Sequence, residues 1–173
     1  MISKKKQGKT ALYGMLIALA FILSYLEAMI PLPIPIPGVK LGLANLVTMV
    51  ALYTVGVRGT IVVSLIRIVL TGFTFGNLFS MIYSLSGSIV SLLLMMLCKK
   101  SNWFSSIGVS IAGGIGHNIG QMIIAAFVVQ TVGVFYYLPA LLVAGVVAGT
   151  LIGMLGGMVT KRIQGFIKNY NLL

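Results

Sequence analysis

Side chains that could carry acid–base or metal chemistry are scarce in this chain. Its 173 residues include one carboxylate, Glu27, one histidine, His117, and one cysteine, Cys98. A paired-carboxylate site, a two-metal cluster and a Cys/His zinc site each need more such groups than the chain has. No Gly-rich Walker A loop ending in Lys and Ser/Thr is present, so the chain does not hydrolyse ATP by itself. We therefore expect no enzyme activity, no metal site and no cofactor.

Arg67 and Glu27 are ionisable side chains within apolar stretches, where such groups are costly and are functional candidates by default. At about 1.5 Å per helical residue, Arg67 lies roughly 12 Å into its stretch, and its planar fork suits a carboxylate or a phosphate. It is either a ligand anchor or part of a structural ion pair. Glu27 lies roughly 24 Å along the first stretch. It is either a counter-ion to Lys40 or Arg67, or a group that binds a cationic or hydrogen-bonding ligand.

A second group of polar candidates lies in residues 114–121, which read Gly-Ile-Gly-His-Asn-Ile-Gly-Gln. His117 and Gln121 are one helical turn apart on one face, with Asn118 beside them. Asn45 and Asn77 fall at a similar depth near the ends of other stretches. These side chains either converge from four helices on one outward-facing pocket, or only hydrogen-bond neighbouring helices. The candidate ligand-binding residues are Glu27, Lys40, Asn45, Arg67, Asn77, His117, Asn118 and Gln121.

The composition predicts that membrane-spanning helices position these residues. Hydrophobic residues make up 59% of the chain and the mean hydropathy is +1.12, well beyond what a soluble domain of this length could bury. About 20 apolar residues cross a hydrocarbon core of about 30 Å. Six candidate spans follow one another at about 11–30, 41–55, 59–73, 78–97, 104–129 and 136–159. We expect an all-α integral membrane protein, a six-helix bundle forming one membrane domain over residues 1–173.

The basic residues predict how the chain crosses the bilayer. All Lys and Arg residues except Lys40 and Arg67 fall in four clusters, at Lys4–Lys9, Arg58, Lys99–Lys100 and Lys161–Lys168. Because Lys and Arg stay on the cytoplasmic side, clusters at every second boundary predict six crossings with both termini cytoplasmic and Lys40 outside. Topology and lipid contact thus account for the formal charge of +11, and we expect no nucleic-acid partner.

Small residues predict where helices approach closely. Gly145, Gly149, Gly153 and Gly157 step by four along the last span, which leaves a smooth groove on one helix face. Gly14 and Ala18 form a smaller pair on the first span, facing either a bundle neighbour or a separate subunit. Residues 31–38 read Pro-Leu-Pro-Ile-Pro-Ile-Pro-Gly, which cannot be helical. This loop is either a simple helix terminator or a lid over a site on the outer face.

Several stretches resemble the Gx transporter family, which is also described as heptaprenyl diphosphate synthase component I. They are residues 33–46, which include Gly-Val-Lys-Leu-Gly-Leu-Ala-Asn, then Leu-Ile-Arg at 65–67, Gly-Phe-Thr-Phe-Gly at 72–76 and Gly-His-Asn-Ile-Gly-Gln at 116–121. The resemblance covers nearly the whole chain. Family members are similar in size and layout to the S components of energy-coupling factor (ECF) transporters, which are six-helix bundles of the bacterial cytoplasmic membrane. In those, a small-residue face on the first helix docks a transmembrane coupling subunit, and two ATPase subunits supply the energy. The resemblance implies this contact for Gly14 and Ala18.

Two interpretations follow from this resemblance. The first is the substrate-binding subunit of an uptake transporter, whose excess of cationic and amide donors suits an anionic or amide-rich ligand, with an isoprenoid or quinone precursor as one candidate. The second is a non-catalytic membrane accessory protein linked to heptaprenyl diphosphate synthase or to quinone metabolism. Prenyl diphosphate synthases hold diphosphate through Mg²⁺ on Asp-rich motifs, whereas this chain has no Asp. A self-sufficient carrier is less favoured, because no inverted repeat is evident and Glu27 is the sole carboxylate.

Overall fold

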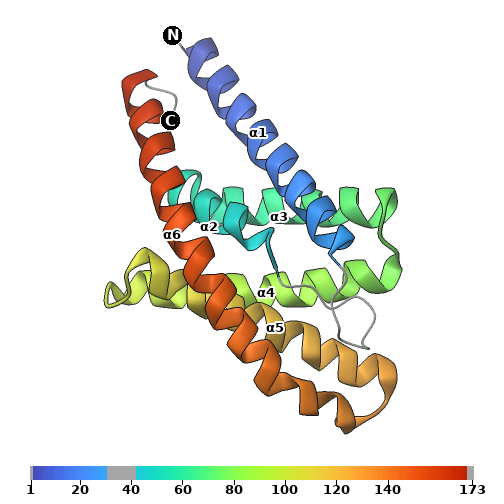
Figure 1. The fold of residues 1–173 in the computed structure, drawn as a ribbon. Coiled ribbons are helices and arrows are strands. Elements are labelled where there is room, and N and C mark those ends of the chain that lie inside the picture. Colours follow the sequence, from blue (N-terminus) through green and yellow to red (C-terminus); the bar gives the residue numbers. More distant parts are fainter. Residues whose placement is uncertain (1, 31–41, 171–173) are drawn as a thin grey trace.

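The computed structural model describes residues 2–30 and 42–170, and these residues form helices joined by short connections (Figure 1). The elements are α1 (Ile2–Met29), α2 (Asn45–Thr54), α3 (Gly56–Thr74), α4 (Leu78–Ser101), α5 (Ser106–Val129), the short 3₁₀ helix η1 (Val132–Tyr137) and α6 (Leu138–Tyr170). No strand occurs in the two described ranges. The all-helical class predicted from composition is therefore confirmed. The proline-rich loop and Lys40 lie outside the described residues.

Polar residues at the helix ends set where the helices begin and stop. The side chain of Asn77 accepts a hydrogen bond from the backbone N–H of Ser80 at 2.8 Å and so caps the start of α4. Ser105 caps α5 in the same way, accepting from the N–H of Gly108 at 3.3 Å. Asn102, in the left-handed conformation with φ of 57°, ends α4. Between these ends the apolar sequence must be helical, because lipid offers no partner for backbone polar groups.

The second predicted span is shorter than expected. Five helices in the described residues are long and apolar enough to cross a membrane, whereas α2 has only 10 residues. Ten residues rise about 15 Å, half of a core of about 30 Å. Two glycines bound this helix, because Gly42 has φ of +85° and Gly56 has φ of +75°. These left-handed conformations are ones that only glycine adopts readily, so the chain turns at both positions instead of extending the helix.

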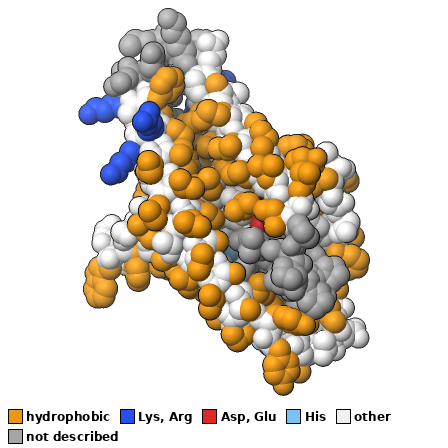
Figure 2. All heavy atoms as spheres, viewed as in Figure 1, with side chains coloured by type: hydrophobic (Ala, Val, Ile, Leu, Met, Phe, Trp, Pro, Cys, Tyr) orange, Lys and Arg blue, Asp and Glu red, His pale blue; other side chains and the backbone are white. Residues whose placement is uncertain are grey.

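The basic end of the bundle is held together by contacts among α2, α4 and α6. The Nζ of Lys99 donates to the backbone oxygen of Leu52 at 2.7 Å and lies 4.3 Å from the ring centre of Tyr53. The Nε2 of Gln164 donates to the backbone oxygen of Tyr53 at 2.8 Å. Figure 1 shows the start of α1 and the end of α6 at the same end of the molecule, and Figure 2 shows blue basic side chains gathered over that part. Lys99 of α4 contacts Tyr53, and Lys161 of α6 lines a cavity with the same tyrosine, so basic residues far apart in the sequence meet at this end.

Lys99→Met is expected to lower the stability of the protein by about 1–3 kcal/mol, because it removes a charged hydrogen bond and a cation–π contact that hold the end of α2. Thermal unfolding of the purified protein in mild detergent measures this loss. Lys100→Met is the matched control, since it removes an exposed lysine from the next position. Equal melting temperatures for the two variants would show that Lys99 does not anchor α2.

Helix α5 lies between α4 and α6 and approaches both at glycines (Figure 1). A Cβ atom built on Gly149 of α6 would come within 2.6 Å of the Cα of Ile111 on α5. A Cβ built on Gly114 would come within 2.5 Å of the backbone oxygen of Gly145. On its other side, a Cβ at Gly120 would come within 2.6 Å of a backbone oxygen of α4. The close helix approach predicted from the four-residue glycine spacing is confirmed.

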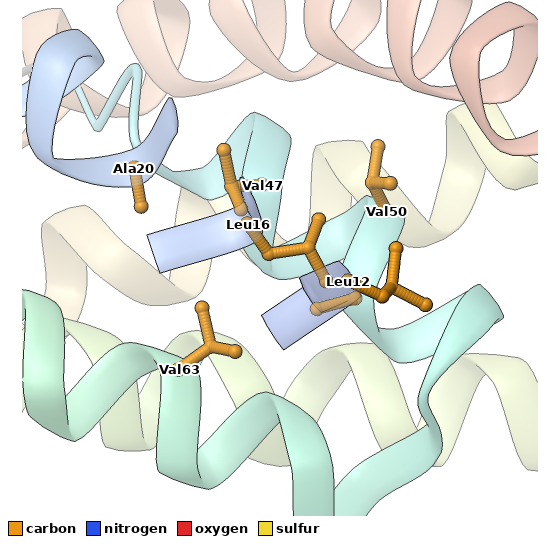
Figure 3. Packing of buried hydrophobic residues seen from close by; sticks show 7 residues of the cluster. Leu12, Leu16, Ala20, Val47, Val50 and Val63 are labelled. Carbon is orange, nitrogen blue, oxygen red and sulfur yellow. The ribbon is translucent and has the colours of Figure 1, made fainter. Parts of the chain in front are cut away.

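One face of α1 packs on α2 and α3, which fixes the direction in which its other face points. Figure 3 shows this apolar cluster, formed by Leu12, Leu16, Ala20, Val47, Val50, Ala51 and Val63. Its α1 members recur every four residues, as expected for one helix face. Gly14 and Ala18 lie off this face and are exposed, and a Cβ on Gly14 would meet no atom within 4 Å. In the described structure these two residues therefore face outward and not toward a bundle neighbour.

Candidate functional site

A buried arginine marks the centre of the candidate site. Arg67, on α3, is only 4% exposed. Its Nη1 donates to the Oγ of Ser24 on α1 at 3.3 Å, and its Nη2 donates to the Oγ of Ser88 on α4 at 3.1 Å. The carboxylate of Glu27 attracts it electrostatically. The positive charge of Arg67 thus lies among three helices. Among the described residues, its hydrogen-bond acceptors are two neutral hydroxyl groups.

Glu27, 4% exposed, connects the end of α1 to the turn before α2. Its Oε1 accepts hydrogen bonds from the backbone N–H of Gly42 and from that of Leu43, the latter at 3.2 Å. Hydrogen bonds to an ionised oxygen are the stronger kind, so this pair fixes the entry to α2. Glu27 therefore serves the backbone turn and balances Arg67 at the same time. The counter-ion interpretation of Glu27 agrees with this geometry.

His117 lies between the turn before α2 and helix α4, where glycines leave room for its ring. A Cβ on Gly42 would come within 3.1 Å of its Cδ2, and a Cβ on Gly87 would come within 2.8 Å of its Cε1 and Nδ1. Gly87 precedes Ser88, which accepts from Arg67. Glu27, Gly42, His117, Ser88 and Arg67 thus form one connected group, which we call the polar cluster together with Ser24 and Asn45.

Amide side chains lie within the polar cluster and beside it. A Cβ on Gly42 would come within 2.8 Å of the Nδ2 of Asn45, and this buried Nδ2 has no hydrogen-bond partner among the described residues. Asn118 turns toward α6, where its Nδ2 donates to the backbone oxygen of Leu141 at 2.5 Å while its Oδ1 has no partner in the described part of the chain. Gln121, fully buried, lies one turn along α5 from His117. The interior therefore offers hydrogen-bonding capacity beyond that used between helices.

Two of the predicted ligand residues are placed differently. Asn77 is exposed and caps α4, so its side chain already has a structural role at a helix end. Lys40 lies outside the described residues. Figure 2 shows the acidic and the histidine side chain as small coloured patches on a face that is largely hydrophobic. The structure thus brings together Glu27, Asn45, Arg67 and His117, with Asn118 and Gln121 along α5.

Sequence reasoning missed Ser24 and Ser88, the two hydroxyls that accept hydrogen bonds from Arg67. A signal for both was present. Ser24 lies three residues before Glu27 and so on the same face of α1. Ser88 belongs to a stripe of small polar residues along α4, comprising Ser80, Ser84, Ser88 and Ser91. A row of serines on an otherwise apolar helix could have been predicted to accept hydrogen bonds from the nearest buried charge, Arg67.

The comparisons with known proteins place the chain in a family. Residues 16–159 match the family model for heptaprenyl diphosphate synthase component I. The chain belongs to this family. The matched range includes every residue of the polar cluster, and it confirms the resemblance drawn from the sequence motifs. No curated protein and no solved structure matches the chain.

In this member of the component I family, Glu27→Gln is expected to lower stability by about 1–3 kcal/mol, because it removes the charge that faces Arg67 and weakens the bonds to the turn before α2. In an Arg67→Met background the same change should cost less, because the charge has lost its partner. Thermal unfolding of the four proteins of this double-mutant cycle gives the coupling energy. Fully additive effects would contradict an electrostatic coupling between Glu27 and Arg67.

Proposed function

We propose that this component I family member is a membrane subunit that captures a small molecule for uptake, in the manner of an ECF S component. The observation that carries the proposal is the polar cluster around Arg67. A buried charge is costly unless it is paired and hydrogen-bonded. Here the guanidinium donates to two hydroxyls, while the carboxylate that attracts it also accepts from the N–H groups of Gly42 and Leu43. A carboxylate or phosphate of a ligand would accept hydrogen bonds from the remaining N–H groups of the Arg67 guanidinium.

The kind of ligand follows from the chemistry of the polar cluster. Arg67 supplies a permanent positive charge, and the Nδ2 of Asn45 supplies a donor with no partner among the described residues. The chain has several cationic and amide donors and a single acidic residue, Glu27. This excess of donors favours an anionic or amide-rich ligand, with an isoprenoid or quinone precursor as one candidate. We assign recognition to Arg67, Asn45, His117, Asn118 and Gln121. Glu27 holds Arg67 and the turn before α2 in place.

The outer face of α1 supports the transport proposal through a partner. Gly14 and Ala18 are exposed there, and Gly14 leaves open space beside the helix. Small residues allow another helix to approach closely within a membrane. We assign this face to a transmembrane coupling subunit, which would itself work with two ATPase subunits because this chain has no Walker A motif. The proposed setting is a bacterial cytoplasmic membrane.

The proposed orientation places both termini and the basic end of the bundle in the cytoplasm. Arg67 lies 11 residues into α3, or about 16 Å from that end. The polar cluster then falls toward the outer half of the bundle, where a ligand from outside would arrive. The sixth crossing expected from the sequence, at about residues 41–55, remains part of this proposal.

A second candidate function rests on the family description. That description names a component of a synthase, so a non-catalytic membrane accessory role beside a second synthase component is the alternative. In this case the polar residues would serve helix packing alone. The family description favours this alternative. The buried Nδ2 of Asn45, which has no hydrogen-bond partner among the described residues, favours transport.

Purification from the native host in mild detergent separates the two candidates. Transport predicts that a transmembrane coupling subunit and two ATPases co-purify with the wild-type chain, as identified by mass spectrometry, and that a Gly14→Leu variant loses them. Gly165→Leu is the matched control, because Gly165 also has open space around it but lies near the end of α6. Recovery of a prenyl diphosphate synthase without ATPases would overturn the transport proposal in favour of the accessory role.

A further inference from the structure

A second polar site lies at the basic end of the bundle, away from the polar cluster. A cavity of about 180 Å³ opens where α6 crosses the end of α2 and the start of α5, and its lining includes Tyr53, Ser106, Thr160, Lys161 and Gln164. Ser106 precedes His117 by 11 residues of the same helix, or about 16 Å. The cavity is therefore separate from the polar cluster, and nothing proposed above uses it.

Thr160 is the unusual member of this lining. It is only 6% exposed, and its Oγ1 has no hydrogen-bond partner among the described residues. Other threonines of the bundle satisfy this group within their own helix: the Oγ1 of Thr150, for example, donates to the backbone oxygen of Val146 at 2.8 Å. A buried hydroxyl without a partner is unfavourable, so its presence at a cavity wall indicates a group that binds there.

The electrostatic surroundings of Thr160 favour an anion. Ser106 is the first residue of α5, a helix of 24 residues, and the N–H groups of a first helical turn have no partner within the helix. Of these groups, Ser105 caps that of Gly108. Such a helix end carries a partial positive charge. Lys161 also lines the cavity, and Lys99 lies 4.3 Å from the ring centre of Tyr53. No carboxylate is among the lining residues.

The cavity walls are already fixed in position. A Cβ on Gly157 of α6 would come within 3.2 Å of the Oγ of Ser106, so α6 passes close to the start of α5. Gln164 donates to the backbone oxygen of Tyr53 at 2.8 Å and joins α6 to α2. Walls held in this way lose little freedom on binding, which favours affinity. A volume of about 180 Å³ is below the range of about 300–1,000 Å³ typical of sites for larger ligands and suits a small group.

We infer that this cavity binds a phosphate group through the Oγ1 of Thr160, the ammonium group of Lys161 and the N-terminus of α5. Two sources supply that chemistry at the edge of a membrane: the headgroup of an anionic phospholipid, and soluble phosphate or diphosphate. The inference does not rest on the proposed function, because a phosphate site at the basic end is compatible with either candidate.

The first test measures the melting temperature of the purified, delipidated protein in neutral detergent during titration with inorganic phosphate, diphosphate or phosphatidylglycerol. A phosphate-free glycolipid is the lipid control. Saturable stabilisation by the soluble anions assigns the site to a free phosphate compound. Stabilisation by phosphatidylglycerol alone assigns it to a lipid headgroup. No stabilisation by any of the three would overturn the inference.

Variants then locate the binding site. Thr160→Val and Lys161→Gln should each weaken the apparent affinity about tenfold, the size expected for loss of one hydrogen bond to a charged group. Thr150→Val and Lys168→Gln are the matched controls on the same helix and should leave it unchanged. Thr160→Val should also raise the melting temperature without anions, because it removes a buried hydroxyl that has no partner. Equal weakening in the controls, or no weakening in either cavity variant, would contradict the assignment.

Discussion

Arg67→Met is expected to abolish the stabilisation that the wild-type protein gains from its ligand. The guanidinium would donate charged hydrogen bonds to an anionic ligand. Truncating one partner of a buried, hydrogen-bonded charge pair costs about 2–5 kcal/mol, or roughly thirtyfold to several thousandfold in affinity. The melting temperature of ligand-depleted protein, measured with and without the small-molecule fraction of the growth medium, reports this loss. The small-molecule fraction should raise the melting temperature of the wild-type protein and leave that of Arg67→Met unchanged.

Two further variants make the result specific to the buried arginine. Arg58→Met removes an exposed arginine near the start of the same helix and should keep the full shift. Arg67→Lys keeps the charge but loses the planar fork, so it should bind more weakly than wild type and still respond. If Arg67→Met responds like Arg58→Met, then Arg67 is not the ligand anchor, and a structural ion pair describes it better.

Gly149→Ala is expected to destabilise the protein by about 1–3 kcal/mol or more, although alanine favours helices over glycine. The added Cβ would lie 2.6 Å from the Cα of Ile111, and backbone atoms cannot move aside as a side chain would. Separation of α5 from α6 would also disturb the bond from Asn118 to Leu141. Thermal unfolding and the monodisperse fraction in size-exclusion chromatography measure the effect.

Gly165→Ala on the same helix is the control for Gly149→Ala, and it should raise the stability of the protein where Gly149→Ala lowers it. Nothing lies within 4 Å of a Cβ at Gly165, so the change should stabilise α6 by about 0.5–1 kcal/mol through helix propensity alone. Similar effects for the two variants would contradict the close approach of α5 and α6.

The helices were largely predictable because lipid leaves an apolar chain few alternatives. Runs of apolar residues, interrupted by basic or turn-forming residues, place α3, α4 and α5 close to their observed bounds. The glycine spacing on α6 predicted its packing, since small residues are what permit two membrane helices to touch. The short α2 was not predictable from hydropathy, because Leu43 and Ala44 are as apolar as helical residues. The turn is evident from the positive φ of Gly42, which the structure shows. The sequence alone does not predict it, because a glycine can adopt positive or negative φ.

The candidate site was predictable in its charged members and less so in its neutral ones. Arg67, Glu27 and His117 stand out because each is rare in an apolar stretch. Ser24 and Ser88 do not, because serine is also common at helix contacts in membranes. Asn77 was assigned by depth alone, and depth does not distinguish a helix cap from a ligand group. Which polar residues meet is decided by helix rotation, and that depends on packing contacts distant in sequence.

Native mass spectrometry of the intact chain in mild detergent shows directly whether the polar cluster holds a ligand. A ligand site there predicts one small-molecule adduct per wild-type chain, anionic or rich in amide groups once released. The adduct should be absent from Arg67→Met and still present in Arg58→Met and Thr160→Val. A wild-type chain that carries only lipid, or an adduct that persists unchanged in Arg67→Met, would contradict a ligand site at the polar cluster and leave the accessory role as the better account.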